Sequence, residues 1–269
     1  NKGYNSVELM HTLNKIIEGQ NLLKNEKDKD IKKELSKKIY KVSQSSLEFD
    51  RNNNLILNLT IDMPFKKEEG FVKGRTLGVD LGVKYPAYVC LNDDTYKREH
   101  IGEALELIKQ RKQYQERRRR TQQQLKNVKG GKGRYKKLKN LNRLGECERN
   151  FTKTYNHMIS KRIVEFAKKY KCQYINMEKL TKDGFNDSIL RNWSYYELQS
   201  MVEYKADRVG IKVRYINPAY TSQTCSKCGH IDKENRQTQE KFKCTKCGLE
   251  LNADHNASIN ISRSEDFVK

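Results

Sequence analysis

The sequence predicts an α/β protein with a mixed central sheet, flanking helices and a small insert, and two observations support this prediction. From residue 76 onward, strand-like and helical segments follow in the order β-β-β-α-β-α-β, and a final helix comes last. Two closely spaced cysteine pairs separate the last strand from that helix, which marks the insert. A chain of 269 residues is long enough for one medium domain with an insert, or for two small domains.

Residues 1–75 are expected to form a helical segment, a β segment and a linker. Apolar residues recur at roughly helical spacing through residues 6–49, and residues 54–63 alternate as they do in a strand. Residues 65–75, with three lysines and two glycines, resemble a linker. The chain opens at Asn1 rather than at a methionine, and we expect this part to be the remnant of an upstream domain in a longer protein.

The predicted core covers residues 76–220. Short β-branched runs are expected to be strands, and longer amphipathic runs are expected to be helices. In chain order these are strands at 76–82, 85–91 and 97–102, a basic helical insert at 103–144 with a loop at Lys129–Gly133, a helix at 151–170, a strand at 172–178, a helix at 194–210 and a strand at 211–216. The cysteine insert covers residues 221–250, and the last segment, 251–269, carries the final helix.

The composition indicates a polyanionic partner. The formal net charge is +21, and a charge that large calls for nucleic acid or an anionic membrane. No apolar stretch approaches the ~20 residues that span a bilayer, and no signal peptide is visible. We therefore expect nucleic acid and no membrane. The seven cysteines are odd in number and four form two tight pairs, which favours a reducing, intracellular compartment over a disulfide framework.

The positive charge is concentrated in a basic belt between Lys109 and Arg143. This stretch holds fifteen lysines and arginines and one acid, Glu116. Charge at that density usually neutralises phosphates rather than reading bases, and the alternative is a solvated helical face with many salt bridges. Too few carboxylates are present for such bridges. We therefore expect nucleic-acid contacts from Arg117, Arg118, Arg119, Arg120, Lys132, Arg134, Lys136 and Lys137.

The two cysteine pairs predict a metal site. Cys225 and Cys228 form one Cys-x-x-Cys pair, Cys244 and Cys247 form the other, and a glycine follows each. Four thiolates satisfy the tetrahedral preference of zinc, and the spacing lets one turn present two sulfurs to the same ion. We expect one structural Zn²⁺, because four protein ligands leave no open position for water. His230 is a weaker alternative ligand.

Three acidic residues stand out by their context. Asp80 interrupts an apolar strand, Glu178 ends another, and Asp254 lies at a predicted helix start directly after the cysteine insert. A carboxylate in apolar surroundings loses hydration unless a cation offsets that cost. Each acid alone has the simpler explanation of a helix cap or a salt bridge. Together, in a strongly basic chain, they predict a site where one or two divalent cations support phosphodiester hydrolysis.

Three segments resemble a known family. GVDLGVKYPAYV, YINMEKL and the stretch from YTSQTCSKCGH to NADHNASINI are similar to the catalytic segments and zinc ribbon of TnpB nucleases, and equally to those of miniature type V-F CRISPR effectors. The resemblance covers roughly residues 54–262. It implies a RuvC/RNase H-like fold, a metal-dependent RNA-guided DNA endonuclease, magnesium binding by Asp80, Glu178 and Asp254, and a ribbon that touches target DNA. It also implies that Arg236 approaches the scissile strand, although Arg236 could be an ordinary solvated loop residue.

The same resemblance implies guide RNA and target DNA as partners, a prokaryotic cytoplasm, and either a monomer or an asymmetric homodimer. It places the basic belt beside the guide–target heteroduplex. A non-catalytic nucleic-acid-binding module and a strand-transfer transposase are the alternatives. The segment Lys179–Trp193 is either a lid over the site or an ordinary loop. Trp193, Tyr195 and Tyr196 are expected to be core residues rather than base-stacking ones.

Overall fold

The computed structural model describes residues 4–50, 53–62, 64, 70–82, 84–179 and 195–268, and it divides into two compact units, Asn1–Lys67 and Glu68–Lys269. In the first unit, the helices α1 (Tyr4–Asn25) and α2 (Lys29–Lys38) precede two strand pairs. The short β1 (Lys41–Val42) pairs with β4 (Ile61–Asp62), and β2 (Ser46–Phe49) forms a hairpin with β3 (Leu55–Asn58). The expected helices are present, but residues 46–49 are a strand because β3 supplies their hydrogen-bonding partner.

The second unit is built on a five-stranded mixed sheet. Its order is β7 (Arg98–Ile101), β6 (Ala87–Leu91), β5 (Val72–Asp80), β8 (Cys172–Glu178) and β9 (Lys212–Ile216). The strand β6 is antiparallel to both of its neighbours, β7 and β5, whereas β5, β8 and β9 are parallel. The expected linker at 65–75 is wrong from Val72 onward, because Val72 pairs with Cys172 and belongs to the sheet.

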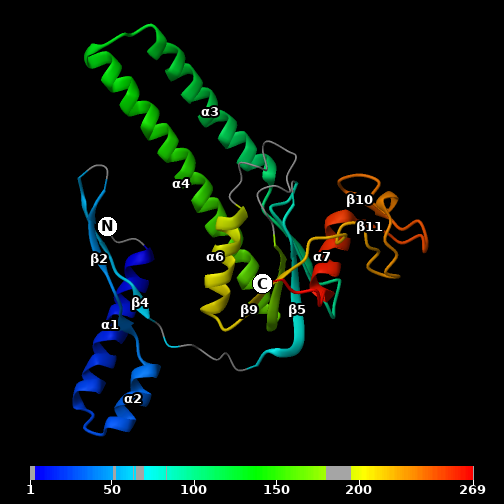
Figure 1. The fold of residues 1–269 in the computed structure, drawn as a ribbon, viewed down its shortest axis with the longest axis horizontal. Helices are drawn as coiled ribbons and strands as arrows, with labels where there is room; N and C mark the ends of the chain where they lie inside the picture. Colours follow the sequence, from blue (N-terminus) through cyan, green and yellow to red (C-terminus); the bar gives the residue numbers. More distant parts are fainter. Residues whose placement is uncertain are drawn as a thin grey trace. The chain divides into compact units, whose positions relative to one another are not determined.

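In the described part of the second unit, α4 (Gly131–Lys169), α6 (Tyr195–Asp207) and α7 (Ala253–Arg263) pack against the sheet, and α3 (Ala104–Lys126) packs along α4. The predicted break between two basic helices is present, but the expected loop at Lys129–Gly133 is wrong from Gly131 onward, since α3 ends at Lys126 and α4 begins at Gly131. The predicted separate helix at 151–170 is wrong, because α4 runs without interruption through Gly145. Figure 1 shows α3 and α4 side by side as an antiparallel pair.

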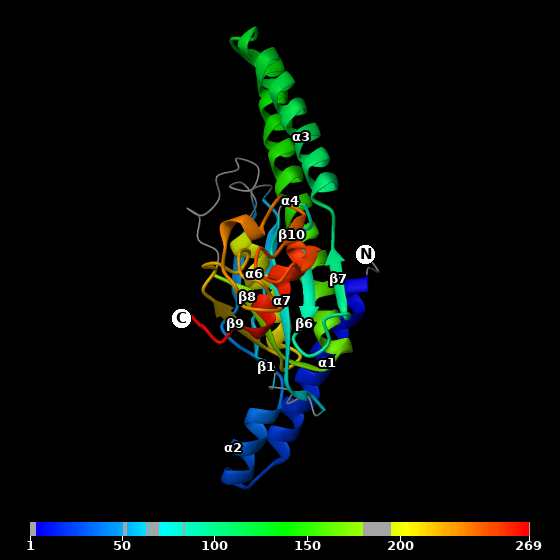
Figure 2. The ribbon, with the colours of Figure 1, turned by 90° about the vertical axis from the view of Figure 1, so that its right-hand side faces the viewer.

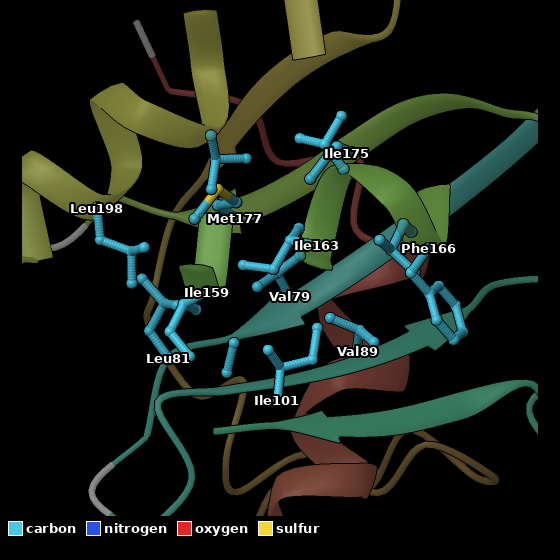
Figure 3. Packing of buried hydrophobic residues seen from close by; sticks show 14 of the residues in the cluster. Val79, Leu81, Val89, Ile101, Ile159, Ile163, Phe166, Ile175, Met177 and Leu198 are labelled. Carbon is cyan, nitrogen blue, oxygen red and sulfur yellow. The ribbon is translucent and has the colours of Figure 1, made fainter. Parts of the chain in front are cut away.

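The two-residue period of the strands decides which side chains meet which helices. Leu77 and Val79 of β5, with Ile175 and Met177 of β8, are fully buried on the face that α4 and α6 cover. Figure 3 shows these strand residues packed with side chains such as Ile159 of α4. This layer is the hydrophobic core of the unit, so the alternate residues of the same strands face the opposite side.

That opposite side is covered by α7 (Figure 2), which contacts β5, β6 and β8. A Cβ atom at Gly78 would lie 2.1 Å from the Ser258 carbonyl oxygen, so the helix backbone can pack here only against a glycine. Asn176 of β8 donates its Nδ2 to the Ile261 carbonyl oxygen at 2.9 Å. The helices on both faces of the sheet confirm the predicted α/β class. None of the described helices has the length and apolar content needed to cross a membrane.

Candidate functional site

Two of the predicted acids end adjacent parallel strands. Asp80 is the last residue of β5 and Glu178 is the last residue of β8, and the preceding pair, Val79 and Met177, is in register. The carboxyl ends of parallel strands meet at one sheet edge. Each acid lies two residues after a residue that meets α7, Gly78 or Asn176, so both acids lie on the face that α7 covers. Burial raises the pKa of Asp80 well above its usual range, and the neighbouring Glu178 and Asp254 carboxylates raise it further.

The third acid comes from the first turn of α7. Asn252 caps this helix by accepting the His255 backbone N–H at 3.1 Å, which places Asp254 at the helix start. Asp254 is 6% exposed, and its Oδ1 lies 3.9 Å from where a Cβ atom of Gly82 would stand, beside the end of β5. Burial raises its pKa, and Arg236 lowers it. The fold thus brings the three predicted acids together.

Arg236 is the cation of this site. It follows the short helix η2 (Lys233–Asn235), and its backbone forms a bridge with Phe242. Burial is the largest effect on the pKa of Asp80, Glu178 and Asp254, and it raises all three. The positive charge of Arg236 acts in the opposite direction on each of them. The side chain is partly buried rather than an isolated surface group. Arg236 therefore lies within electrostatic reach of every acid in the cluster, and its approach to the scissile strand stays a prediction.

The four predicted cysteines converge into one cluster. In the described part of the chain, they are the only group of potential metal ligands whose donor atoms all lie within 4.8 Å of one another. The Sγ atoms of Cys225 and Cys247 are 3.6 Å apart, as are those of Cys228 and Cys244. A tetrahedron with zinc–sulfur bonds of about 2.3 Å requires sulfur separations of about 3.8 Å. The cluster therefore fits the zinc site that the sequence predicted.

Two equivalent turns build the cysteine cluster. Gly229 and Gly248, which follow the second cysteine of each pair, have positive φ values of 72° and 71°. The N–H of Gly229 donates to the Cys225 carbonyl at 2.9 Å, and Gly248 repeats this bond with Cys244 at 3.0 Å. A small antiparallel pair, β10 (Lys241–Lys243) and β11 (Glu250–Asn252), holds the second turn. His230 stands outside the cluster and faces Asp232 at 3.8 Å.

The basic belt lies on α3 and on the first half of α4, and its residues differ in exposure. Arg117, Arg119, Arg120, Lys132 and Lys136 are exposed, whereas Arg118, Arg134 and Lys137 are partly buried. Arg118 is 3.4 Å from Glu148 of α4, a carboxylate just beyond the acid-poor stretch. Arg134 donates to the carbonyl oxygens of Leu125 and Val128 at 3.1 and 2.7 Å. These two arginines therefore have structural partners that the local composition did not indicate, and nucleic-acid contact from the belt stays a prediction.

The predicted role of the basic belt can be tested by how nucleic-acid affinity changes with salt concentration. Replacing Arg117–Arg120 with glutamine should flatten the slope of log affinity against log salt by about 1.8, which is two lost phosphate contacts at about 0.9 each on B-form DNA. Two contacts are expected because consecutive helical residues face different directions and because Arg118 is engaged by Glu148. Binding titrations at several salt concentrations measure the slope.

The matched control removes the same charge from another exposed helix. Replacing Lys29, Lys32, Lys33 and Lys37 of α2 with glutamine changes the net charge equally. If the belt contacts phosphates, the α2 variant keeps the steeper slope. If the slope of log affinity against log salt is equal in the two variants, or unchanged in the belt variant, the arginines face solvent and do not contact phosphates.

The predicted lid, Lys179–Trp193, lies outside the described residues except for Lys179. Trp193 also lies outside them, whereas the two tyrosines that follow it are described. Tyr195 is 4% exposed and belongs to the core, as expected. Tyr196 is 77% exposed, so its assignment to the core is wrong: neighbouring helical residues point about 100° apart, and only one of them can face the sheet.

Sequence reasoning missed several contacts around the acids. The Thr221 hydroxyl donates to Oε1 of Glu178, and Gln199 donates its Nε2 to the Glu178 carbonyl at 2.6 Å. Lys84, four residues after Asp80, pairs with Glu240 of the ribbon at 2.6 Å. Thr221 lies inside the segment that resembles the family, but no local pattern marks which hydroxyl meets which carboxylate.

The sheet, the clustered acids and the cysteine turns define the class: a RuvC/RNase H-like protein with a four-cysteine ribbon before its last helix. Residues 195–261, which include this ribbon, match the family model of the Cas12f1-like TNB domain. A CRISPR-associated endodeoxyribonuclease Cas12f1 of Sulfoacidibacillus thermotolerans is 38% identical over 229 residues, which cover 83% of this chain and 53% of that protein. A TnpB-like protein of Methanocaldococcus jannaschii is 33% identical over 129 residues, 45% of each chain.

A solved structure agrees with these relatives. The cryo-EM structure of a Cas12f1–sgRNA–target DNA complex matches with a TM-score of 0.69 and 29% identity, over 93% of this chain and 51% of that chain. These findings confirm the resemblance to TnpB proteins and type V-F effectors. The chain spans about half the length of the Cas12f1 relative.

Proposed function

We propose that this chain is the catalytic part of an RNA-guided DNA endonuclease, in which a RuvC site hydrolyses phosphodiester bonds. The observation that carries the proposal is the convergence of Asp80, Glu178 and Asp254 at one edge of the sheet, with Arg236 beside them. The names of the relatives support it, since Cas12f1 of Sulfoacidibacillus thermotolerans is an endodeoxyribonuclease and a solved Cas12f1 complex contains sgRNA and target DNA.

The acid cluster fits divalent cations with oxygen ligands. Burial and repulsion by the neighbouring carboxylates raise the pKa of Asp80, and the positive charge of Arg236 only partly opposes this rise. Hard carboxylate oxygens are the ligands that Mg²⁺ prefers, so Asp80, Glu178 and Asp254 would hold two such ions. When bound, magnesium supplies an activated water and stabilises the leaving 3′-oxygen, which yields 5′-phosphate and 3′-hydroxyl ends.

The protein's own residues orient the DNA around this cluster. Arg236 can pair with a phosphate as negative charge builds during cleavage, because a guanidinium offers two parallel hydrogen bonds. The basic belt would hold phosphate backbones beside the guide–target heteroduplex, and the ribbon at residues 221–250 would touch target DNA. Residues 76–220 and 251–269 would together form the nuclease core, and the first unit would be the remnant of the upstream wedge or recognition domain.

Guide exchange tests the proposed function. The full-length protein, purified with its native RNA, should cleave DNA in Mg²⁺ at a position that moves when the guide sequence is changed, because base pairing supplies the specificity. A scrambled guide is the matched control. Cleavage that ignores the guide contradicts RNA guidance, and binding without cleavage favours the non-catalytic module. Mass measurement of the same complex separates a monomer from an asymmetric homodimer.

A further inference from the structure

The Glu178 carboxylate has a hydrogen-bond partner that lies outside the acid cluster. The Thr221 hydroxyl donates to Oε1 of Glu178, and the Pro218 carbonyl oxygen, at 3.2 Å, is its other acceptor within reach. A hydroxyl has one proton, and a charged carboxylate is the stronger acceptor. Gln199 holds the Glu178 backbone carbonyl at 2.6 Å. Both the backbone and the carboxylate of Glu178 are therefore held by other side chains.

Thr221 is itself fixed by the helix that carries Asp254. Asn260 of α7 donates its Nδ2 to the Thr221 carbonyl oxygen at 2.9 Å and to the Thr224 carbonyl oxygen at 2.7 Å. Asn256, fully buried and one helical turn earlier, donates to the same Thr224 carbonyl at 2.8 Å. Main-chain carbonyls of the loop are thus anchored to one face of α7, and the side chain of Thr221 is left to point at Glu178.

The same helix face also reaches the cysteine cluster. Oδ1 of Asn256 accepts the backbone N–H of Ser226 at 3.0 Å, directly after Cys225. The loop between β9 and the first cysteine pair is therefore held by α7 from its middle, at Thr221, to its cysteine end, at Thr224 and Ser226. One element positions Asp254 directly, Glu178 through Thr221, and the first cysteine turn through Asn256.

We infer that Thr221 is a positioning residue: its hydroxyl holds the Glu178 carboxylate in the orientation that binds the divalent cation. This inference rests on the proposed metal-dependent function. Carboxylates that bind metals are oriented by hydrogen bonds from outside the ligand set, and losing such a partner costs about 10- to 100-fold in metal affinity or activity.

Two substitutions separate the hydroxyl from the shape of the side chain. Thr221→Val removes the hydroxyl and keeps the branched shape, whereas Thr221→Ser keeps the hydroxyl. Thr224→Val is the matched control, because the Thr224 hydroxyl lies in the same loop but donates to the Tyr220 carbonyl at 2.8 Å rather than to an acid. Thr221→Ala is the second hydroxyl-free variant, should the valine fail to fold. Zinc content and a thermal melt of each protein establish which variants are folded.

The decisive readout is binding of the metal alone. Titration with Mn²⁺, followed by the EPR signal of the free ion, reports on carboxylate sites because Mn²⁺ shares the oxygen-ligand preference of Mg²⁺. Thr221→Val should weaken Mn²⁺ binding by about 10-fold or more, and Thr221→Ser and Thr224→Val should bind as the unaltered protein does. The cleavage rate of Thr221→Val should fall at low Mg²⁺ and recover in part as Mg²⁺ is raised.

Unchanged Mn²⁺ affinity in a folded Thr221→Val or Thr221→Ala protein would overturn the inference and leave Thr221 as a loop contact. Equal losses in the serine and valine variants would also overturn it, because the hydroxyl would then not be the cause. Glu178→Ala separates this outcome from failure of the proposed function. If Glu178→Ala binds Mn²⁺ normally, the metal site itself is wrongly assigned, whatever Thr221 does.

Discussion

Replacing Asp80, Glu178 or Asp254 with alanine is expected to slow DNA cleavage by about a thousandfold or more and to leave nucleic-acid binding nearly unchanged. The metal ions of such a site supply several kcal/mol of transition-state stabilisation, and each ~1.4 kcal/mol corresponds to tenfold in rate. Glu178 and Asp254 both lie within electrostatic reach of Asp80, so losing any one of the three acids should dismantle the same ion cluster. Single-turnover cleavage in Mg²⁺ and a parallel binding titration measure the two effects.

The double and triple variants sharpen this test. Because the acids act as one unit, a second alanine should add little to the loss caused by the first. Glu99→Ala is the matched control: it removes a carboxylate from the same sheet, on β7, where Arg162 already pairs with it. Substantial cleavage by any of the three single variants would show that the acid concerned is not a ligand. A large loss in Glu99→Ala would mean that the assay reports on folding rather than on metal binding.

Replacing Cys228 or Cys247 with serine is expected to release the zinc ion, unfold the ribbon and abolish most of the cleavage activity. Structural zinc contributes about 10–16 kcal/mol of binding energy in small zinc domains, and this energy is folding energy. The ribbon leads directly into the helix that carries Asp254, since β11 ends at Asn252 and α7 begins at Ala253. Elemental analysis should find about one zinc per chain in the unaltered protein and none in the variants.

Cys147→Ser is the matched control for the zinc prediction. Cys147 is also exposed but lies on α4, outside the four-cysteine cluster. It should keep its zinc, its melting temperature and its activity. A fully active protein that contains no zinc would refute the structural role of the ion, and loss of zinc in Cys147→Ser would point to a general effect of thiol removal.

The sequence alone determined those parts of the protein that depend on neighbours along the chain. The Cys-x-x-Cys-Gly spacing is a property of one turn, so the cysteine cluster and its two positive-φ glycines were predictable at Cys228 and Cys247. The apolar runs around Asp80 and before Glu178 were predictable as strands for the same reason, because a short apolar run is a local pattern. The local pattern placed Glu178 at the end of its strand, whereas Asp80 was expected inside the strand 76–82 and ends β5 in the structure.

Only the tertiary structure decided which distant groups meet. Glu148 pairs with Arg118 from 30 positions away because α3 and α4 pack together. Arg118 therefore has a partner within the protein that the composition of the basic belt did not indicate. Thr221 reaches Glu178 from 43 positions away because α7 holds its loop. Such contacts follow from the packing of helices and strands against one another, which depends on the whole core, so no local pattern encodes them.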